Sequence, residues 1–235
     1  MRSKILTASA AVLALGMTAA CGGGSPYVTM AKPTGTVTDV EGNVYPTIII
    51  GKQEWMVENL KTTQFADGTP IPNVTDGVTW FDLTSHAYAW YDNDIANKDL
   101  YGALYNWYVV DTTIICPDGW TVPSQDNWQA LADSLGGTAV AGGRMKEAGT
   151  VHWQAPNTGA TNQSGFAALP AGWRSLTGAF IEQGQVAMWW TSTPYLLTLD
   201  PEGVFWDASS RSTSSNGANA RFQSGFSIRC RRSVN

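Results

Sequence analysis

The chain has 235 residues, of which 43% are hydrophobic and 14% charged, and its formal net charge is −5. This length fits a single domain with a full core. A weakly charged, acidic chain argues against nucleic acid and polyanions as ligands, so we expect no nucleic-acid partner.

Residues 1–20 have the form of a secretory signal peptide. Arg2 and Lys4 precede a short apolar run, and without these two cations the net charge becomes −7. The run ends in Thr-Ala-Ala-Cys-Gly, which resembles a bacterial lipobox, so Cys21 is predicted to be lipidated and to anchor the chain to a membrane. Thr18 replaces the usual aliphatic residue, which leaves ordinary cleavage as the alternative. Residues 21–35 then form the lipidated cysteine and a flexible tether.

Short antiparallel strands are predicted in the domain that follows, residues 36–235. Runs of Val, Ile, Tyr and Trp up to residue 60 are broken by turn residues at 41–43 and 51–52. Further strands are expected at 186–191 and 203–206. The remainder is rich in loops.

One clear helix and one weaker helix are expected. Ser124 is the predicted N-cap of the first helix, Trp128, Leu131 and Leu135 lie on one face of it, and a Gly-Gly pair ends it. The weaker helix is predicted through residues 144–147.

A closing strand is predicted at residues 226–231, because apolar and polar residues alternate there. The alternating residues are Phe226, Ser227, Ile228, Arg229, Cys230 and Arg231. This period predicts that Phe226, Ile228 and Cys230 face the core and that the polar residues face solvent.

Cys116 and Cys230 remain once Cys21 is assigned to lipid. Exported proteins tend to oxidise spare thiols, so a Cys116–Cys230 disulfide is predicted. Two separate buried thiols are the alternative.

The chain contains eleven tryptophans, scattered along its whole length. Large rings fill irregular gaps in a loop-rich domain, so most are expected in the core. An exposed subset would instead form a platform on which sugars stack.

Several ordered blocks together identify a family. They are GKQEWMVENL at 51–60, FADGTPIP at 65–72, YGALYNW at 101–107, CPDGWTVPS at 116–124, PNTGATN at 156–162, SGF at 164–166, WWTST at 189–193 and GFSIRC at 225–230. The chain resembles the Fibrobacter succinogenes major paralogous domain over residues 36–232. That family occurs mostly in exported proteins and lipoproteins of Bacteroidetes and Fibrobacteres.

The resemblance implies a C-type-lectin-like α+β fold related to the formylglycine-generating enzymes, with short antiparallel strands and one or two helices. It implies no established reaction. In variable proteins of diversity-generating retroelements, which share this fold, a stretch before the last strand forms a changeable binding face. The matching stretch here, residues 206–222, is called the display segment below. Its predicted ligand-binding residues are Trp206, Ser209, Ser210, Arg211, Thr213, Ser215, Asn216, Asn219 and Arg221. An ordinary solvated loop is the alternative.

Signals for catalysis are weak. A formylglycine-type oxidase would need a reactive thiol pair, whereas Cys116 and Cys230 are better explained as a bridge. Glu54 and Glu58 invite a general acid/base interpretation but lie in a scaffold-like block.

Metal signals are weak as well, and we predict no metal site. His86 and His152 lack the spacing of zinc ligands. Calcium is the one cofactor that the sequence admits, because oxygen ligands gather in one loop, although ordinary turns use the same residue types. These residues are Asp92, Asn93, Asp94, Asn97 and Asp99.

The sequence therefore predicts a lipid-anchored protein of the cell envelope, expected at the outer membrane. We expect it to be a non-catalytic ligand-binding or adhesion module whose partner is a protein or a glycan. A passive structural component and a degenerate formylglycine-generating-like or glycan-processing enzyme are the alternatives.

Overall fold

A computed structural model describes residues 31–195, 202–207 and 214–234. The predicted signal peptide and Cys21 lie outside this part. In chain order the elements are β1 (Gly35–Thr38), β2 (Val44–Ile50), β3 (Gln53–Met56), α1 (Gly77–Phe81), β4 (Tyr88–Ala89), η1 (Tyr91–Asn93), η2 (Ile95–Asn97), α2 (Lys98–Tyr101), β5 (Leu104–Tyr105), α3 (Trp107–Asp111), α4 (Gln125–Ser134), α5 (Thr138–Met145), β6 (Trp173–Arg174), β7 (Phe180–Ile181), β8 (Met188–Tyr195), β9 (Glu202–Asp207), β10 (Ser214–Arg221) and β11 (Arg231–Ser233).

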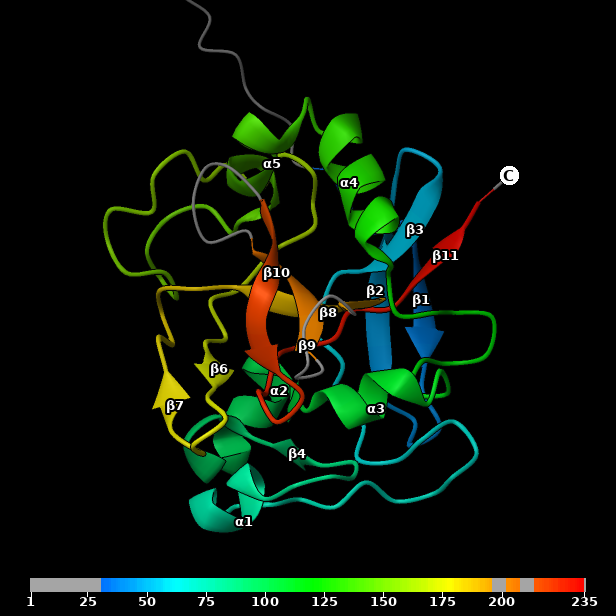
Figure 1. The fold of residues 1–235 in the computed structure, drawn as a ribbon. Coiled ribbons are helices and arrows are strands. Elements are labelled where there is room, and N and C mark those ends of the chain that lie inside the picture. The colour runs from blue at the N-terminus through cyan, green and yellow to red at the C-terminus, as the bar shows by residue number, and fades with distance from the viewer. Residues whose placement is uncertain (1–30, 196–201, 208–213, 235) are drawn as a thin grey trace, which may run out of the picture.

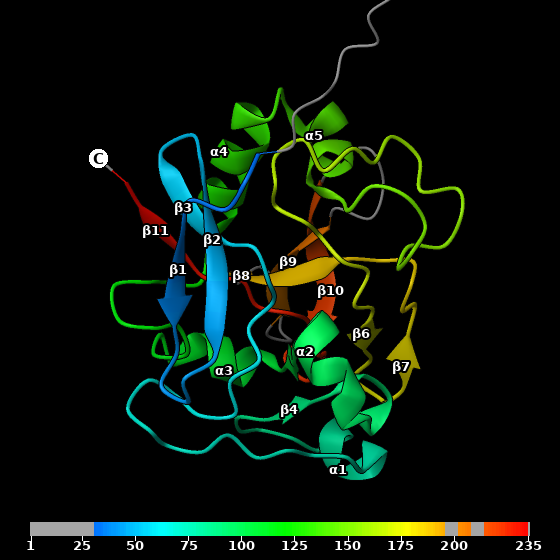
Figure 2. The same ribbon diagram turned by 180° about the vertical axis from the view of Figure 1, so that it is seen from behind.

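The described elements form a mixed architecture of antiparallel sheets and short helices (Figure 1). The sheet β1-β2-β3-β11 lies on one side, α4 and α5 lie together at one end, and β8, β9 and β10 cross the middle. The view from behind shows the same arrangement, with β6 and β7 on the side away from the first sheet (Figure 2). The α+β class predicted from the sequence is therefore confirmed.

The first sheet joins the beginning of the domain to its end. Its order is β1-β2-β3-β11, and every neighbouring pair is antiparallel. Asp39 shapes the β1–β2 turn, because its Oδ1 accepts from the backbone N–H of Glu41 at 3.0 Å and of Asn43 at 2.9 Å. The strands predicted within residues 36–60 are confirmed.

The second sheet has the order β10-β9-β8, so β10 lies at an edge of the described sheet. β8 and β9 confirm the strands predicted near residues 186–191 and 203–206, although β8 runs further, to Tyr195. Both strand pairs change register partway along, which marks a bulge.

Helix α4 starts where the sequence predicts. Ser124 is its N-cap and forms a reciprocal capping box with Asn127. The weaker helix was misplaced: α5 begins at Thr138 and ends at Met145, and Gly142 and Gly143 lie buried inside it. The sequence also missed α1, α2 and α3, each only four or five residues long.

The closing strand predicted at residues 226–231 is wrong in two respects, the burial of its polar residues and the position of the strand. Ser227 and Arg229 are each only 1% exposed, like their apolar neighbours, and regular pairing begins only at Arg231. Only single bridges hold residues 226 and 227, where Phe226 pairs with Tyr105 and Ser227 pairs with Trp189. The Ser227 hydroxyl accepts from Asn59, and the Arg229 guanidinium packs on the Phe166 ring, so both polar side chains are internal.

A disulfide between Cys116 and Cys230 links residues 114 positions apart, with the two Cα atoms 5.8 Å apart. The predicted bridge is confirmed, and the alternative of two free thiols is wrong. Both cysteines are buried in a hydrophobic cluster that also contains Trp107, Trp190 and Phe226. The bridge therefore fastens the last strand to the middle of the chain inside the core.

Most tryptophans are core residues, as predicted. The buried ones are Trp55, Trp80, Trp90, Trp107, Trp120, Trp128, Trp153, Trp189 and Trp190. Trp173 is half-buried and donates from Nε1 to Glu182 at 3.1 Å. These nine buried rings cannot present a stacking face to a sugar.

Candidate ligand-binding site

The display segment, residues 206–222, starts on β9 and ends just beyond β10. Trp206 pairs with Ser215, and Phe205 pairs with Asn216, across the two antiparallel strands. Asn219 lies within the irregular stretch of β10, and Arg221 ends that strand. The predicted residues Ser209, Ser210, Arg211 and Thr213 fall outside the described residues. Residues 206–207 and 214–221 of the display segment are therefore strand, and its role in ligand binding stays a prediction.

The carboxyl end of the display segment is fixed by aromatic contacts. The Phe222 ring stacks on Trp107, with ring centres 5.6 Å apart and planes at 18°, and lies edge-on to Tyr108. The backbone N–H of Trp107 donates to the backbone carbonyl of Phe222 at 2.9 Å. Gln223 follows and donates from Nε2 to the Leu83 carbonyl at 3.1 Å. This end of the segment is thus held against α3 and the residues after α1.

The amino end of the display segment lies near a buried cation. Lys146 is 2% exposed, and its Nζ lies 5.0 Å from the centre of the Trp153 ring. Burial lowers the pKa of Lys146, and the charge of Asp207 acts in the opposite direction. Asp207, the last residue of β9, is therefore attracted towards the end of α5. No sequence signal identified this lysine.

A cavity of about 340 Å³ lies at the end of the display segment. We call it the Arg221 hollow, and it is lined by Phe81, Leu176, Arg221 and Gln223. Phe81 is 51% exposed, and Arg221 is exposed as well. The hollow combines a ring, an aliphatic side chain, a guanidinium group and an amide, a set suited to orienting a small polar ligand.

The walls of the hollow come from α1 and the β6–β7 turn, which pack unusually closely. Gly178 in the turn has φ +84°, and a Cβ there would lie only 2.4 Å from the Cα of Gly77. Glycine is required at this point because any side chain would push α1 away from the turn. The first turn of α1 is capped by Asp76, whose Oδ1 accepts from the Thr79 N–H at 2.7 Å.

Arg174 fastens the same walls from within. Its guanidinium lies 4.1 Å from the centre of the Trp80 ring and 4.7 Å from that of Phe180. It also donates to the carbonyls of Thr75 and Gly178, each at 3.0 Å. Burial lowers the pKa of Arg174 to about 10, so the group remains charged at neutral pH. The base of the hollow is therefore rigid.

The carboxylates considered for catalysis serve separate contacts. Glu54 is buried, accepts from Thr47 Oγ1 at 2.6 Å and pairs with Arg232 at 2.6 Å. Glu58 pairs with Lys61 at 3.6 Å. Glu54 therefore joins β3 to β2 and β11, and Glu58 makes a local contact within the loop after β3.

The residues considered for calcium are turn and cap residues in this structure. Asp94 accepts from the Ala96 N–H at 2.9 Å, and Asn97 donates to the Tyr91 carbonyl at 2.9 Å. Asp99 lies 3.4 Å from the Nζ of Lys61. Within residues 31–195, 202–207 and 214–234, no three side chains of His, Cys, Asp or Glu gather as a metal site would require. The absence of a metal cofactor stays a prediction, with calcium in this loop as its alternative.

The histidines lie apart, in different surroundings. His86 is edge-on to Phe65, with ring centres 5.0 Å apart. His152 Nδ1 lies 2.9 Å from a Glu147 oxygen, and its ring is edge-on to Tyr101. The structure does not bring the two histidines together.

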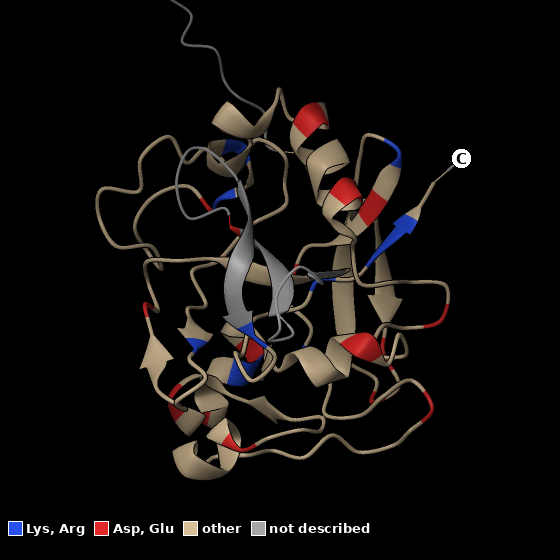
Figure 3. Cartoon of the chain, in the orientation of Figure 1, with Lys and Arg blue, Asp and Glu red and all other residues tan. Residues whose placement is uncertain are grey.

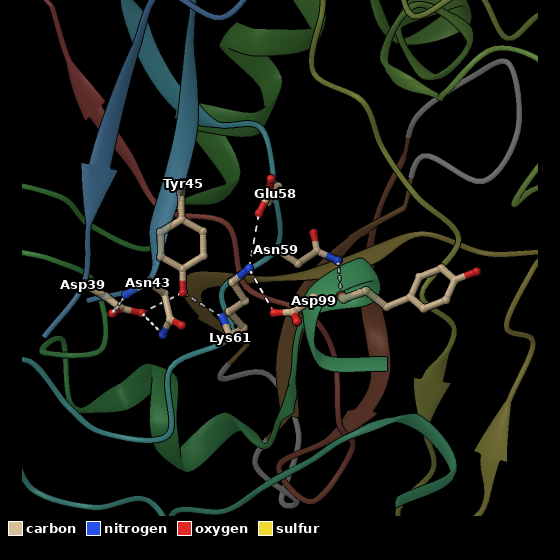
Figure 4. A network of polar contacts seen from close by, with 8 residues as sticks. Asp39, Asn43, Tyr45, Glu58, Asn59, Lys61 and Asp99 are labelled. Atoms are coloured by element: carbon tan, nitrogen blue, oxygen red, sulfur yellow. Dashed lines mark hydrogen bonds and ion pairs between the residues drawn. The ribbon is translucent and has the colours of Figure 1, made fainter. Parts of the chain in front are cut away.

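A polar network beneath β2 supports the scaffold (Figure 4). The Tyr45 hydroxyl donates to Asp39 Oδ2 at 2.7 Å and accepts from the Lys61 N–H at 3.0 Å. Burial, followed by the hydrogen bond to Asp39, raises the pKa of Tyr45, so the phenol stays protonated. Asn59 donates to the Tyr101 carbonyl at 2.8 Å. These contacts tie the β1–β2 hairpin to the residues after β3.

Comparison with known proteins identifies the family. The family model of the Fibrobacter succinogenes major domain matches residues 48–232. The searches of curated proteins and of solved structures gave no match. Across the described residues, every helix is too short or too polar to cross a bilayer. Since the match covers most of the sequence, the chain belongs to the Fibrobacter succinogenes major domain family.

Proposed function

We propose that this protein is a non-catalytic ligand-binding or adhesion module of the cell envelope. Its display segment and the Arg221 hollow would contact a protein or glycan, and a C-type-lectin-like scaffold would hold them. The observation that carries the proposal is that Arg221, at the end of the predicted display segment, lines a cavity of about 340 Å³ together with Phe81 and Leu176.

The scaffold beneath the display segment is firmly cross-linked, whereas the display segment itself is rich in adaptable polar residues, and this combination supports a binding role. The base is fixed by the Cys116–Cys230 bridge and by the buried guanidinium of Arg174. The display segment is rich in Ser, Asn and Arg, residues that form adaptable hydrogen bonds in recognition loops. Diversification of the segment by a retroelement is part of the proposal, and sequencing the gene from related isolates would test it.

Export and lipidation complete the proposal. The signal-like residues 1–20 and Cys21 support an envelope protein held by its acylated cysteine at the outer membrane. In a Cys21→Ser variant, we expect the protein to leave the membrane fraction. Retention of this variant in the membrane would argue against anchoring at Cys21.

The binding role can be tested on arrays of glycans and surface proteins. We expect selective binding by the purified full-length chain. Phe81→Ser combined with Arg221→Gln should weaken binding at least tenfold without changing the melting temperature. The matched control is Val151→Ser with Lys52→Gln, because Val151 is 82% exposed and Lys52 is an exposed turn residue. Binding that both double variants retain equally would refute a role for the hollow.

A further inference from the structure

A second cavity, of about 350 Å³, lies where α3, α4, β8 and the first residue of β11 meet. None of its described lining residues also lines the Arg221 hollow. We propose that this cavity, the Arg231 pocket, binds a small molecule or chain end through a carboxylate group. The inference goes beyond the proposed function, because it concerns a different site and a defined ligand chemistry.

The central observation is a cation that has no anionic partner within the described part of the chain. Arg231 and Arg232 are neighbours on β11, where successive side chains point to opposite faces. Arg232 forms an ion pair with Glu54 at 2.6 Å. The guanidinium of Arg231 instead donates to two neutral oxygens, Asn127 Oδ1 at 2.7 Å and Ser233 Oγ at 3.0 Å. Among the described residues, no carboxylate lies within ion-pair distance of Arg231. β11 stands out as a basic strand (Figure 3).

Arg231 has hydrogen-bonding capacity left over. A guanidinium group carries five N–H donors, and in Arg231 two of them form hydrogen bonds with described residues. Its Nε is buried and has no hydrogen-bond partner among the described residues. Arginine binds carboxylates through paired N–H groups, so an incoming carboxylate would supply the missing negative charge and would accept from the second N–H of Nη1 and of Nη2.

The rest of the lining limits the size and character of the ligand. Val110 and Val122 are buried core residues that form an apolar wall. Ser124 and Ser192 bring hydroxyl groups to the same cavity. The volume lies near the lower end for small-molecule sites. These features fit a single unit that has a carboxylate, a few polar atoms and a short aliphatic part, such as an acidic monosaccharide or the last residue of a peptide.

Arg231 is held in place before any ligand arrives. Its backbone N–H donates to the Thr121 carbonyl, and the Thr121 N–H donates back to Arg231, each at 2.9 Å. Asn127 Oδ1 also accepts from the Ser124 N–H at 2.9 Å, so the guanidinium rests on the capping box of α4. The preceding residue, Cys230, is fixed by the disulfide. A preorganised cation loses little freedom when it binds.

The test uses calorimetric titration of the purified full-length chain with two pairs of probes. Galacturonate is compared with neutral galactose, and N-acetyl-L-alanine is compared with its amide. We expect at least one carboxylate to bind and its neutral counterpart to bind at least tenfold more weakly. Galacturonate binding would identify an acidic sugar as the source of the carboxylate, and N-acetylalanine binding would identify a peptide end.

Two variants separate the pocket from general electrostatics. Arg231→Gln removes the charge and should weaken carboxylate binding at least tenfold, while Lys52→Gln makes the same change in net charge and should leave binding unchanged. Arg231→Lys keeps the charge but loses the paired donors, so it should bind with intermediate affinity. Melting curves verify that each variant is folded. The proposal is overturned by an absence of carboxylate binding up to about 10 mM, by equal binding of the neutral probes, or by equal losses in Arg231→Gln and Lys52→Gln.

Discussion

Arg229 donates from Nη1 to the backbone carbonyl of Phe166, while its guanidinium lies 4.2 Å from the centre of the ring of the same residue. It also donates to Asn59 Oδ1 at 2.8 Å and to the Ala167 carbonyl at 3.2 Å. Burial lowers the pKa of Arg229 to about 9, so the group stays charged at neutral pH. One side chain thereby joins the last segment of the domain to two distant loops.

Replacing this arginine should be costly. Arg229→Met would leave two buried carbonyls and the Asn59 side-chain oxygen without these donors, so we expect the free energy of unfolding to fall by about 3 kcal/mol. Urea titration measures the change. The exposed substitution Lys52→Met should change stability by less than about 0.5 kcal/mol. Similar small effects of both substitutions would show that other donors replace Arg229.

Loss of the Cys116–Cys230 bridge should destabilise the whole domain. The bridge closes a loop spanning 114 positions, and the chain-entropy account assigns such a loop about 4 to 5 kcal/mol. We therefore expect the double substitution Cys116→Ala and Cys230→Ala to lower the midpoint of guanidinium unfolding strongly. A thiol reductant should shift the natural chain in the same way and leave the double variant unaffected. An unchanged midpoint in both experiments would contradict the expectation.

The buried phenols of Tyr45 and Tyr105 should make the fold sensitive to alkaline pH. Burial raises the pKa of both groups, with the hydrogen bond to Asp39 adding to the effect at Tyr45. In the unfolded chain each phenol ionises near pH 10. Above that pH the unfolded state binds fewer protons than the folded state, so the free energy of unfolding falls as the pH rises.

Tyr105→Phe isolates one of these groups. At pH 8 it should cost about 1 kcal/mol, because the hydrogen bond from the Tyr105 hydroxyl to the Thr62 carbonyl, 2.7 Å long, is lost. Above about pH 10 the free energy of unfolding of the variant should fall less steeply than that of the natural chain. The two slopes should differ by up to about 1.4 kcal/mol per pH unit. Urea titrations at pH 8 to about 11 compare the two slopes. Parallel curves for the two proteins would rule out a contribution from Tyr105.

Gly178→Ala should damage the Arg221 hollow more than a comparable glycine substitution elsewhere. Gly149→Ala is the matched control, because Gly149 has φ +85° and its added Cβ would meet nothing within 4 Å. Both variants bear the strain of a positive φ, about 1 kcal/mol. Only Gly178→Ala also collides with Gly77, so its melting temperature should fall further and ligand binding should weaken. Equal melting temperatures would show that α1 moves aside without cost.

Features encoded by neighbouring residues were predictable. Ser124, Asn127 and the Gly-Gly pair define α4 within a short stretch, and β1 to β3 follow from turn residues placed between apolar runs. The burial of most tryptophans follows from their size. The disulfide followed from the count of cysteines and the expected oxidising compartment.

Features that depend on distant contacts were not predictable. Ser227 and Arg229 look solvent-facing by their period, but both bond to Asn59, 168 and 170 positions away. Helix α5 contains Gly142 and Gly143 in its interior. Glycines usually mark the ends of a helix, so the sequence predicts that the helix starts after them. The Arg221 hollow forms where α1, the β6–β7 turn and β10 lie side by side. No pattern within a short stretch of sequence indicates that these three segments are in contact.

The pairing of β11 with β3 has a consequence for how the molecule is made. Because the chain is synthesised from its amino end, β3 is made long before Arg231, the residue of β11 that pairs with Trp55. Cys116 must likewise wait for Cys230, and the carbonyls of Phe166 and Ala167 must wait for Arg229. Partial products therefore lack the strand, the bridge and the internal cation together, and none of these three interactions can form before the final residues arrive.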